Sequence, residues 1–134
     1  MAYFGNSHIN HEFFWESLAP KSDCGGEFPY LLSDFGMSIQ KYFGSPENLI
    51  IKMTSKCGDT TGMWSALVYN KKTDSLEIKT DLKLSMQGES DDLIPLLSTD
   101  IWVEASNLFY QEFRPEFVDD MWKIVNWDKI EDRF

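Results

Sequence analysis

The sequence predicts an α+β domain in which helices pack on a three-stranded antiparallel sheet. Apolar residues recur with helical spacing through most of the first 56 residues. Two short runs of strand-forming residues joined by a polar turn then predict a β-hairpin. Helices and strands are grouped along the chain rather than alternating, which is typical of an α+β fold with an antiparallel sheet. We expect one domain over residues 1–134, because 134 residues suit a single core.

Composition excludes several classes of function. Hydrophobic residues make up 43% of the chain and aromatic residues 15%, which supports a packed core and argues against disorder. The net charge of −10 repels phosphate groups, so little direct nucleic-acid contact is expected. Cys24 and Cys57 form neither a CxxC pair nor a disulfide framework. No apolar run approaches the roughly 20 residues that span a bilayer, so no membrane contact is expected.

The first predicted helix spans residues 9–18 and follows a turn at residues 5–7. One face of this helix carries, at positions i, i+3, i+4 and i+7, His11, Phe14, Trp15 and Leu18. A histidine on an apolar face is either a hydrogen-bonded core residue or a ligand. Both interpretations of His11 stay open at this point.

Two more helices are predicted before the sheet. The second spans residues 29–43 and ends at Gly44. Its buried stripe is predicted to consist of Leu32, Phe35, Ile39 and Tyr42. Ser45 is a favourable N-cap and Pro46 suits the first helical position, so a third helix is expected to run from Pro46 to about Lys56.

The second half of the chain predicts three strands followed by two helices. The hairpin consists of residues 62–70 and 75–80 around a turn at residues 70–74, and residues 93–99 form a third apolar run. One helix is expected to extend to about residue 113. A last helix starts near Pro115, and its predicted buried stripe comprises Phe117, Met121, Ile124 and Val125.

The stretch from Pro95 to Tyr110 contains the candidate chemistry. Asp100 ends an apolar run, and Glu104 follows four residues later. A helical turn would place both carboxylates on one face, with the bulky Trp102 between them. This spacing suits an acid/base pair or a pair of metal ligands.

Four segments together resemble the C-terminal domain of the iron/manganese superoxide dismutases. They are residues 7–20 (SHINHEFFWESLAP), 93–102 (LIPLLSTDIW), 110–118 (YQEFRPEFV) and 122–134 (WKIVNWDKIEDRF). The segments occur in the family's order and cover nearly all of the chain. The resemblance implies helices packed on a three-stranded antiparallel sheet. It also implies that the family's N-terminal helical hairpin is absent from this chain.

The resemblance implies a metal site that has lost ligands. The family holds one iron or manganese ion with three His and one Asp. His11 stands at one His position and Asp100 at the Asp position, whereas Glu104 stands where a ligand His is expected. Val103 replaces the Glu that precedes that His. The remaining His belongs to the absent hairpin.

Further positions of the family's pattern also differ. The family's outer-sphere Gln or His has no match near Lys83 or Leu84, and Ala66 replaces a Trp. A carboxylate in place of a neutral imidazole adds a negative charge, stabilises the higher oxidation state and lowers the redox potential. We therefore expect no catalytic residue and no cofactor. His11 and Asp100 are expected as a vestigial site, with iron or manganese the metal if any is kept.

Two hypotheses of function follow. The first is a non-catalytic structural protein-interaction module, which resembles the superoxide-dismutase-like proteins of the mitochondrial ribosome small subunit. It implies a location in the mitochondrial matrix, with a related superoxide-dismutase-like subunit or ribosomal proteins as partners. The family's symmetric dimer is disfavoured, because facing Glu104 carboxylates would repel each other. The alternative is a superoxide dismutase with an altered shell of His11, Asp100 and Glu104.

The hairpin that the resemblance calls for raises a third possibility. The chain would then be part of a longer protein, or a partner would supply the hairpin. Without it, an apolar face around Phe14 and Trp15 would stay bare, and such faces bind a partner or aggregate.

Overall fold

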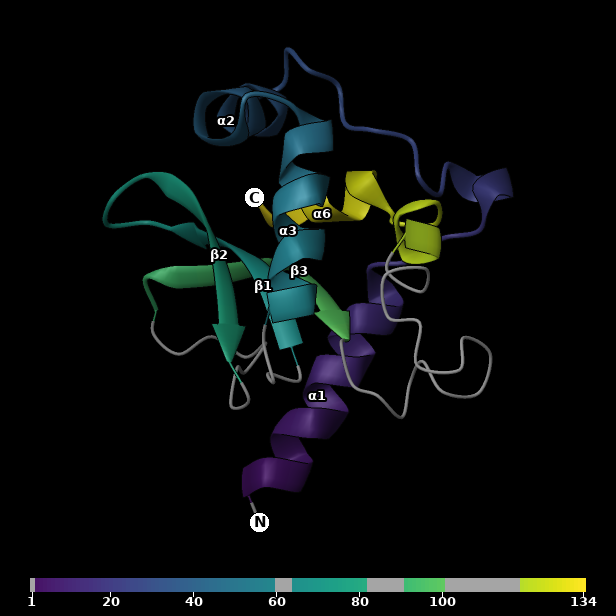
Figure 1. Cartoon of the computed structure of the whole chain (residues 1–134), viewed down its shortest axis with the longest axis vertical. Coiled ribbons are helices and arrows are strands. Elements are labelled where there is room, and N and C mark those ends of the chain that lie inside the picture. The colour runs from purple at the N-terminus through teal and green to yellow at the C-terminus, as the bar shows by residue number, and fades with distance from the viewer. Residues whose placement is uncertain (1, 60–63, 82–90, 101–118) are drawn as a thin grey trace.

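The computed structural model describes all residues except 1, 60–63, 82–90 and 101–118, and it confirms the α+β class (Figure 1). The elements in chain order are α1 (Ala2–Glu16), a short 3-10 helix (Lys21–Asp23), α2 (Asp34–Phe43), α3 (Pro46–Asp59), β1 (Trp64–Asn70), β2 (Ser75–Asp81), β3 (Leu93–Asp100) and α6 (Trp127–Arg133). The helix predicted between residues 100 and 113 lies outside the described residues. No described helix is long and apolar enough to cross a membrane.

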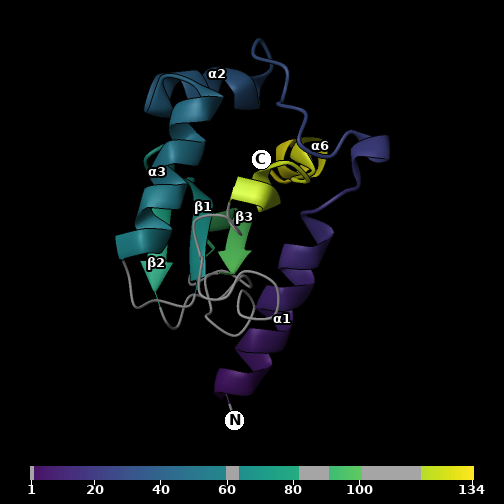
Figure 2. The same ribbon diagram turned by 45° about the vertical axis from the view of Figure 1, so that its right-hand side comes forward.

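The three strands form one antiparallel sheet in the order β2-β1-β3. The predicted hairpin is confirmed: β1 and β2 pair from Asn70↔Ser75 to Trp64↔Asp81. Figure 2 shows the sheet between α3 on one side and α1 with α6 on the other. Because both faces are covered, β1 is buried from Trp64 to Val68 and its apolar alternation is weak.

The third strand is longer than predicted by one residue and ends at Asp100. Pro95 pairs with Val68, and the register shifts between Leu67 and Val68. Proline has no N–H to donate, so an edge strand with an irregular register is where a sheet accepts it. The register places Trp64 opposite Asp100.

The caps of α2 and α3 follow the sequence, but the start of α2 does not. Ser45 caps α3 by accepting a hydrogen bond from the Asn48 N–H at 3.2 Å, and Gly44 ends α2 with φ +85°. The prediction that α2 starts at residue 29 is wrong. Ser33 caps the helix by accepting from the Gly36 N–H at 3.1 Å, and Leu32 stays outside the helix with 69% of its surface exposed.

The first helix also differs from its prediction. It begins at Ala2, so the turn expected at residues 5–7 is wrong. One glycine costs a helix only about 1 kcal/mol, which favourable neighbouring turns offset. Trp15 is 63% exposed, whereas Asn10, Phe14 and Ser17 are buried. The buried stripe therefore includes two polar residues, and a search for apolar spacing alone misplaced it.

The last predicted helix is interrupted. Residues 119–122 are helical, residues 123–126 are not, and α6 begins at Trp127. The interruption pairs with the exit of α1 through an antiparallel bridge between Leu18 and Val125. Its hydrogen bonds join the Ala19 N–H to the Ile124 carbonyl at 2.8 Å and the Asn126 N–H to the Ser17 carbonyl at 2.9 Å. Ile124 is consequently half-exposed, which corrects its predicted burial.

Arg133 at the end of α6 joins α1 to β3. Its Nη1 donates to the Ser17 hydroxyl at 2.6 Å and to the Leu96 carbonyl at 2.9 Å, and its Nη2 lies 3.4 Å from the Glu16 carboxylate. The guanidinium also stacks 3.8 Å from the Phe13 ring centroid. Burial lowers the pKa of Arg133, and Glu16 partly opposes that effect. The planar fork of arginine suits such a multiple contact.

Replacing Arg133 tests this junction. Arg133→Met should reduce the free energy of unfolding by about 2–3 kcal/mol, because the Leu96 carbonyl and the Ser17 hydroxyl lose a charged donor. Urea denaturation measures the change. Lys129→Met, an exposed site on the same helix, is the control and should stay within about 0.5 kcal/mol of the wild type. Equal effects of the two substitutions would contradict the assigned role.

Candidate functional site

The structure brings together two of the predicted site residues, His11 and Asp100. His11 projects from α1, and Asp100 is the last residue of β3. His11 Nε2 lies 2.9 Å from Asp100 Oδ2, across 89 positions of sequence. The imidazole and the carboxylate therefore hydrogen-bond to each other directly.

The surroundings of the pair explain its geometry. The Asp100 side chain is 3% exposed, whereas the His11 side chain is 40% exposed. Trp64 lies opposite Asp100 in the sheet, and its ring meets the His11 ring edge-on with centroids 5.0 Å apart. The sequence did not identify Trp64 as a contact of His11. The position of Trp64 near the start of the first predicted strand was the signal that could have placed it near Asp100, at the end of the third.

Burial gives the pair a structural purpose of its own. A carboxylate that leaves water needs hydrogen-bond donors, and losing one of them costs free energy. His11 supplies one such donor from α1. The contact thus fastens α1 to the end of the sheet.

The other predicted site residues do not add to this pair within the described chain. Glu104, Val103 and Trp102 lie outside the described residues, as do Lys83 and Leu84. Asp100 lies in a strand, so the helical spacing that placed it on one face with Glu104 does not apply to it. Among the residues that the structure describes, no group of three or more His, Cys, Asp or Glu fits a metal ion.

The second histidine does not join the pair. The sequence has two histidines, His8 and His11. His8 Nε2 contacts Glu12 Oε1 at 3.3 Å on the exposed part of α1, and both side chains are mostly in solvent. Of the two, His11 is therefore the histidine that lies beside Asp100.

The pair fits part of a metal site. Two ligand atoms each about 2.1 Å from one ion are about 3 Å apart when they subtend a right angle. His11 Nε2 and Asp100 Oδ2 have a similar separation, 2.9 Å. One imidazole and one carboxylate suit iron or manganese, but they are two donors of the four that the family resemblance requires. The metal-binding role of His11 and Asp100 stays a prediction.

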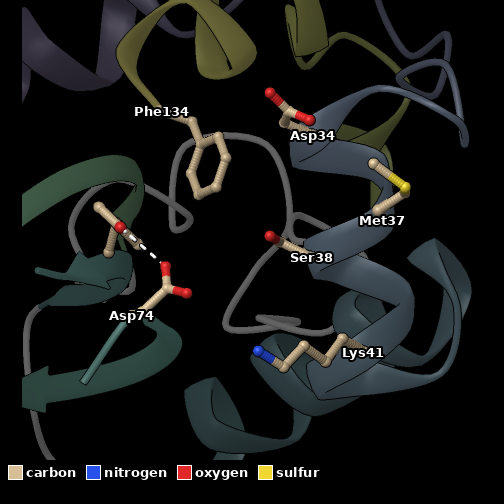
Figure 3. Close-up of a pocket in the computed structure, with 7 residues that line it drawn as sticks. Asp34, Met37, Ser38, Lys41, Asp74 and Phe134 are labelled. Atoms are coloured by element: carbon tan, nitrogen blue, oxygen red, sulfur yellow. Dashed lines mark hydrogen bonds between the residues drawn. The ribbon is translucent and has the colours of Figure 1, made fainter.

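A separate cavity lies at the other end of the hairpin. Its volume is ≈370 Å³, and its lining consists of Asp34, Met37, Ser38, Lys41, Tyr69, Asp74 and Phe134. Figure 3 shows the Phe134 ring between the carboxylates of Asp34 and Asp74, with Lys41 reaching in from α2. The Tyr69 hydroxyl donates to Asp74 Oδ1 at 2.9 Å, and this bond raises the pKa of Tyr69. These contacts stabilise the hairpin turn, and we assign the cavity no activity.

Comparison with known proteins identifies the class to which this fold and site belong. A family model described as iron/manganese superoxide dismutases, C-terminal domain, matches residues 32–133. The α+β domain described above thus corresponds to the C-terminal domain of that family. The chain belongs to the iron/manganese superoxide dismutase family, whose C-terminal domain it contains.

Three relatives illustrate the similarity. The mitochondrial manganese superoxide dismutase 1 of Arabidopsis thaliana is 37% identical over 127 residues, which cover 92% of this chain and 53% of that protein. The iron superoxide dismutase of Tetrahymena pyriformis is 34% identical over 128 residues, which cover 95% of this chain and 65% of that protein. The mitochondrial manganese superoxide dismutase of Onchocerca volvulus is 35% identical over 135 residues, which cover 100% of this chain and 59% of that protein. The chain thus spans between half and two thirds of the length of these relatives.

A double-mutant cycle tests the His11–Asp100 bond. His11→Ala and Asp100→Asn should each destabilise the domain, and their effects should couple by about 1–3 kcal/mol because they share a hydrogen bond to a buried carboxylate. Urea denaturation of the four proteins gives the coupling energy. The exposed pair His8→Ala and Glu12→Gln is the control, with coupling below about 0.5 kcal/mol. Additive effects at His11 and Asp100 would show that the bond does not fasten α1.

Proposed function

We propose that this chain is a non-catalytic superoxide-dismutase-like domain that acts as a structural protein-interaction module. The observation that carries the proposal is Glu104, which stands where the resemblance expects a ligand His. His8 does not take the place of that ligand, because it pairs with Glu12 on exposed surface rather than with the His11–Asp100 pair. The family's ligand set would therefore contain a carboxylate in place of one imidazole.

The chemistry of the replacement supports the same proposal. Dismutation requires a metal ion whose potential lies between the two half-reactions of superoxide. Glu104 in place of a neutral imidazole would add a negative charge and move that potential down. The absence of a matching outer-sphere Gln or His in the sequence removes the group that tunes the bound solvent. In this proposal, His11 and Asp100 persist because their hydrogen bond fastens α1 to β3.

We further propose a mitochondrial location and a place in the mitochondrial ribosome small subunit. Several relatives, including those of Arabidopsis thaliana and Onchocerca volvulus, are named mitochondrial enzymes. The ribosomal assignment rests on the resemblance to superoxide-dismutase-like proteins there that have lost ligands. A net charge of −10 favours a position facing proteins rather than RNA. Its partners would be ribosomal proteins or a related superoxide-dismutase-like subunit.

A second candidate is a superoxide dismutase with an altered shell, which the 2.9 Å contact and the relatives' names favour. His11, Asp100 and Glu104 would then hold iron or manganese, and another chain or segment would complete the set. The metal would supply one-electron exchange with superoxide. The protein's own part would be to orient the ion through the buried Asp100 carboxylate, which the sheet holds in place beside Trp64.

Reconstitution distinguishes the two candidates. The chain is loaded separately with iron and manganese, and superoxide disproportionation is measured against buffer containing the same free metal. We expect no rate above buffer from the wild type. Glu104→His should retain more metal through gel filtration than the wild type, because it restores one imidazole. A wild-type rate that rises in proportion to bound metal would overturn the non-catalytic proposal.

A further inference from the structure

Residues 28–32, which connect the first loop to α2, contain four of the eight exposed large apolar residues in the described part of the chain. Phe28, Tyr30, Leu31 and Leu32 are all exposed, Tyr30 and Leu32 each to 69%. Met37 on α2 is also 49% exposed, but it lines the cavity shown in Figure 3. Single exposed apolar residues are ordinary, but a contiguous group marks an interaction site. We call this group the 28–32 segment.

The backbone of the 28–32 segment is held firmly at its downstream end. The Tyr30 carbonyl accepts from the Ser33 N–H at 3.0 Å and from the Ser33 hydroxyl at 2.8 Å. The Leu31 carbonyl accepts from Gln40 Nε2 at 2.7 Å. A Cβ at Gly36 would lie 2.2 Å from the Tyr30 carbonyl oxygen, so the segment rests directly on α2.

The upstream end is held as well. Gly26 has φ +81° and donates its N–H to the Val125 carbonyl at 2.8 Å. A Cβ there would lie 2.5 Å from the Lys123 carbonyl oxygen, which only glycine avoids. The Phe28 ring packs at 5.7 Å from the Trp127 ring. The apolar side chains are therefore presented on a fixed backbone, which reduces the ordering cost of binding.

A groove adjoins the segment. Phe28 and Leu31 line a cavity of ≈210 Å³ together with Pro46 at the start of α3. Gln40 and Glu47 add polar groups to its lining. This volume suits one bulky side chain of a bound segment.

Carboxylates surround the apolar surface. Glu27, Asp34 and Glu47 are exposed next to the segment and the groove. The pKa of the nearby Cys24 thiol is raised, chiefly by the charge of Glu27 and with contributions from burial, Asp128 and Asp23. Lys41 on α2 stands over the Tyr42 ring and lines the other cavity instead. Exposed carboxylates thus flank the 28–32 segment and its groove, in keeping with the net charge of −10.

We infer that the 28–32 segment and its groove form a docking surface for a basic amphipathic segment of another protein. The inference deepens the proposed interaction-module function and rests on it. The occupant inserts one apolar side chain between Leu31 and Pro46 and places Lys or Arg near Glu27 and Glu47. A second copy of this chain would bring an equally acidic surface against the carboxylates, and an anionic membrane would be repelled in the same way.

A synthetic 14-residue helix of leucine and lysine is the probe, and amide chemical shifts of the full chain report its site. We expect saturable shifts at residues 28–32, 36 and 46–47, with affinity that falls as salt rises. A peptide with leucine changed to serine at the same charge should bind at least tenfold more weakly. A peptide with lysine changed to glutamate should not bind. Shifts centred elsewhere, or binding of the acidic peptide, would overturn the inference.

Variants of the chain complete the test. The double substitution Leu31→Ser with Leu32→Ser should weaken peptide binding at least tenfold, with an unchanged urea midpoint because both side chains are exposed. Trp15→Ser, an exposed aromatic on α1, is the control and should bind as the wild type does. Equal peptide binding by the wild type, the double variant and Trp15→Ser would overturn the inference. So would self-association of the wild type in sedimentation that the double substitution abolishes, because the occupant would then be a second copy rather than a basic segment. Failure of binding in a metal-free chain would refute this surface and leave the non-catalytic proposal standing.

Discussion

The closure of α1 over the third strand is the constraint on which the rest of this structure depends. Two polar contacts secure it along β3. His11 reaches the Asp100 carboxylate at the end of the strand, and Arg133 joins Ser17 to the Leu96 carbonyl near its middle. The Leu18–Val125 bridge holds the exit of α1 just after Ser17 and interrupts the last helical stretch. The first and last segments of the chain thus share one seam with the sheet.

This seam gives His11 and Asp100 a structural reason to pair that does not depend on a metal ion. Asp100 in β3 is buried opposite Trp64, which lies in the central strand β1. Its carboxylate therefore needs a hydrogen-bond donor whether or not an ion is bound. His11 meets that need at 2.9 Å. The pairing of His11 with Asp100 is therefore weak support for catalysis, whereas Glu104 at the position of an expected ligand His bears on it directly.

Local signals in the sequence predicted most of the fold. The hairpin, the Ser45 cap and the Gly44 stop follow from backbone chemistry and were confirmed. One error was local, because Ser33 caps α2 and leaves Leu32 outside the helix. Another arose where a tertiary contact overrides local pattern, because the Leu18–Val125 bridge interrupts the last helical stretch. The contact between His11 and Asp100 spans 89 positions, so no local spacing contained it. The family resemblance alone placed these two residues together.

The metal content of the protein isolated from its native assembly tests the central claim most directly. Elemental analysis, normalised to chain concentration, measures iron and manganese without dependence on reconstitution. A non-catalytic domain in which His11 and Asp100 bond to each other predicts far less than one ion per chain. One iron or manganese ion per chain, held through gel filtration, would contradict it.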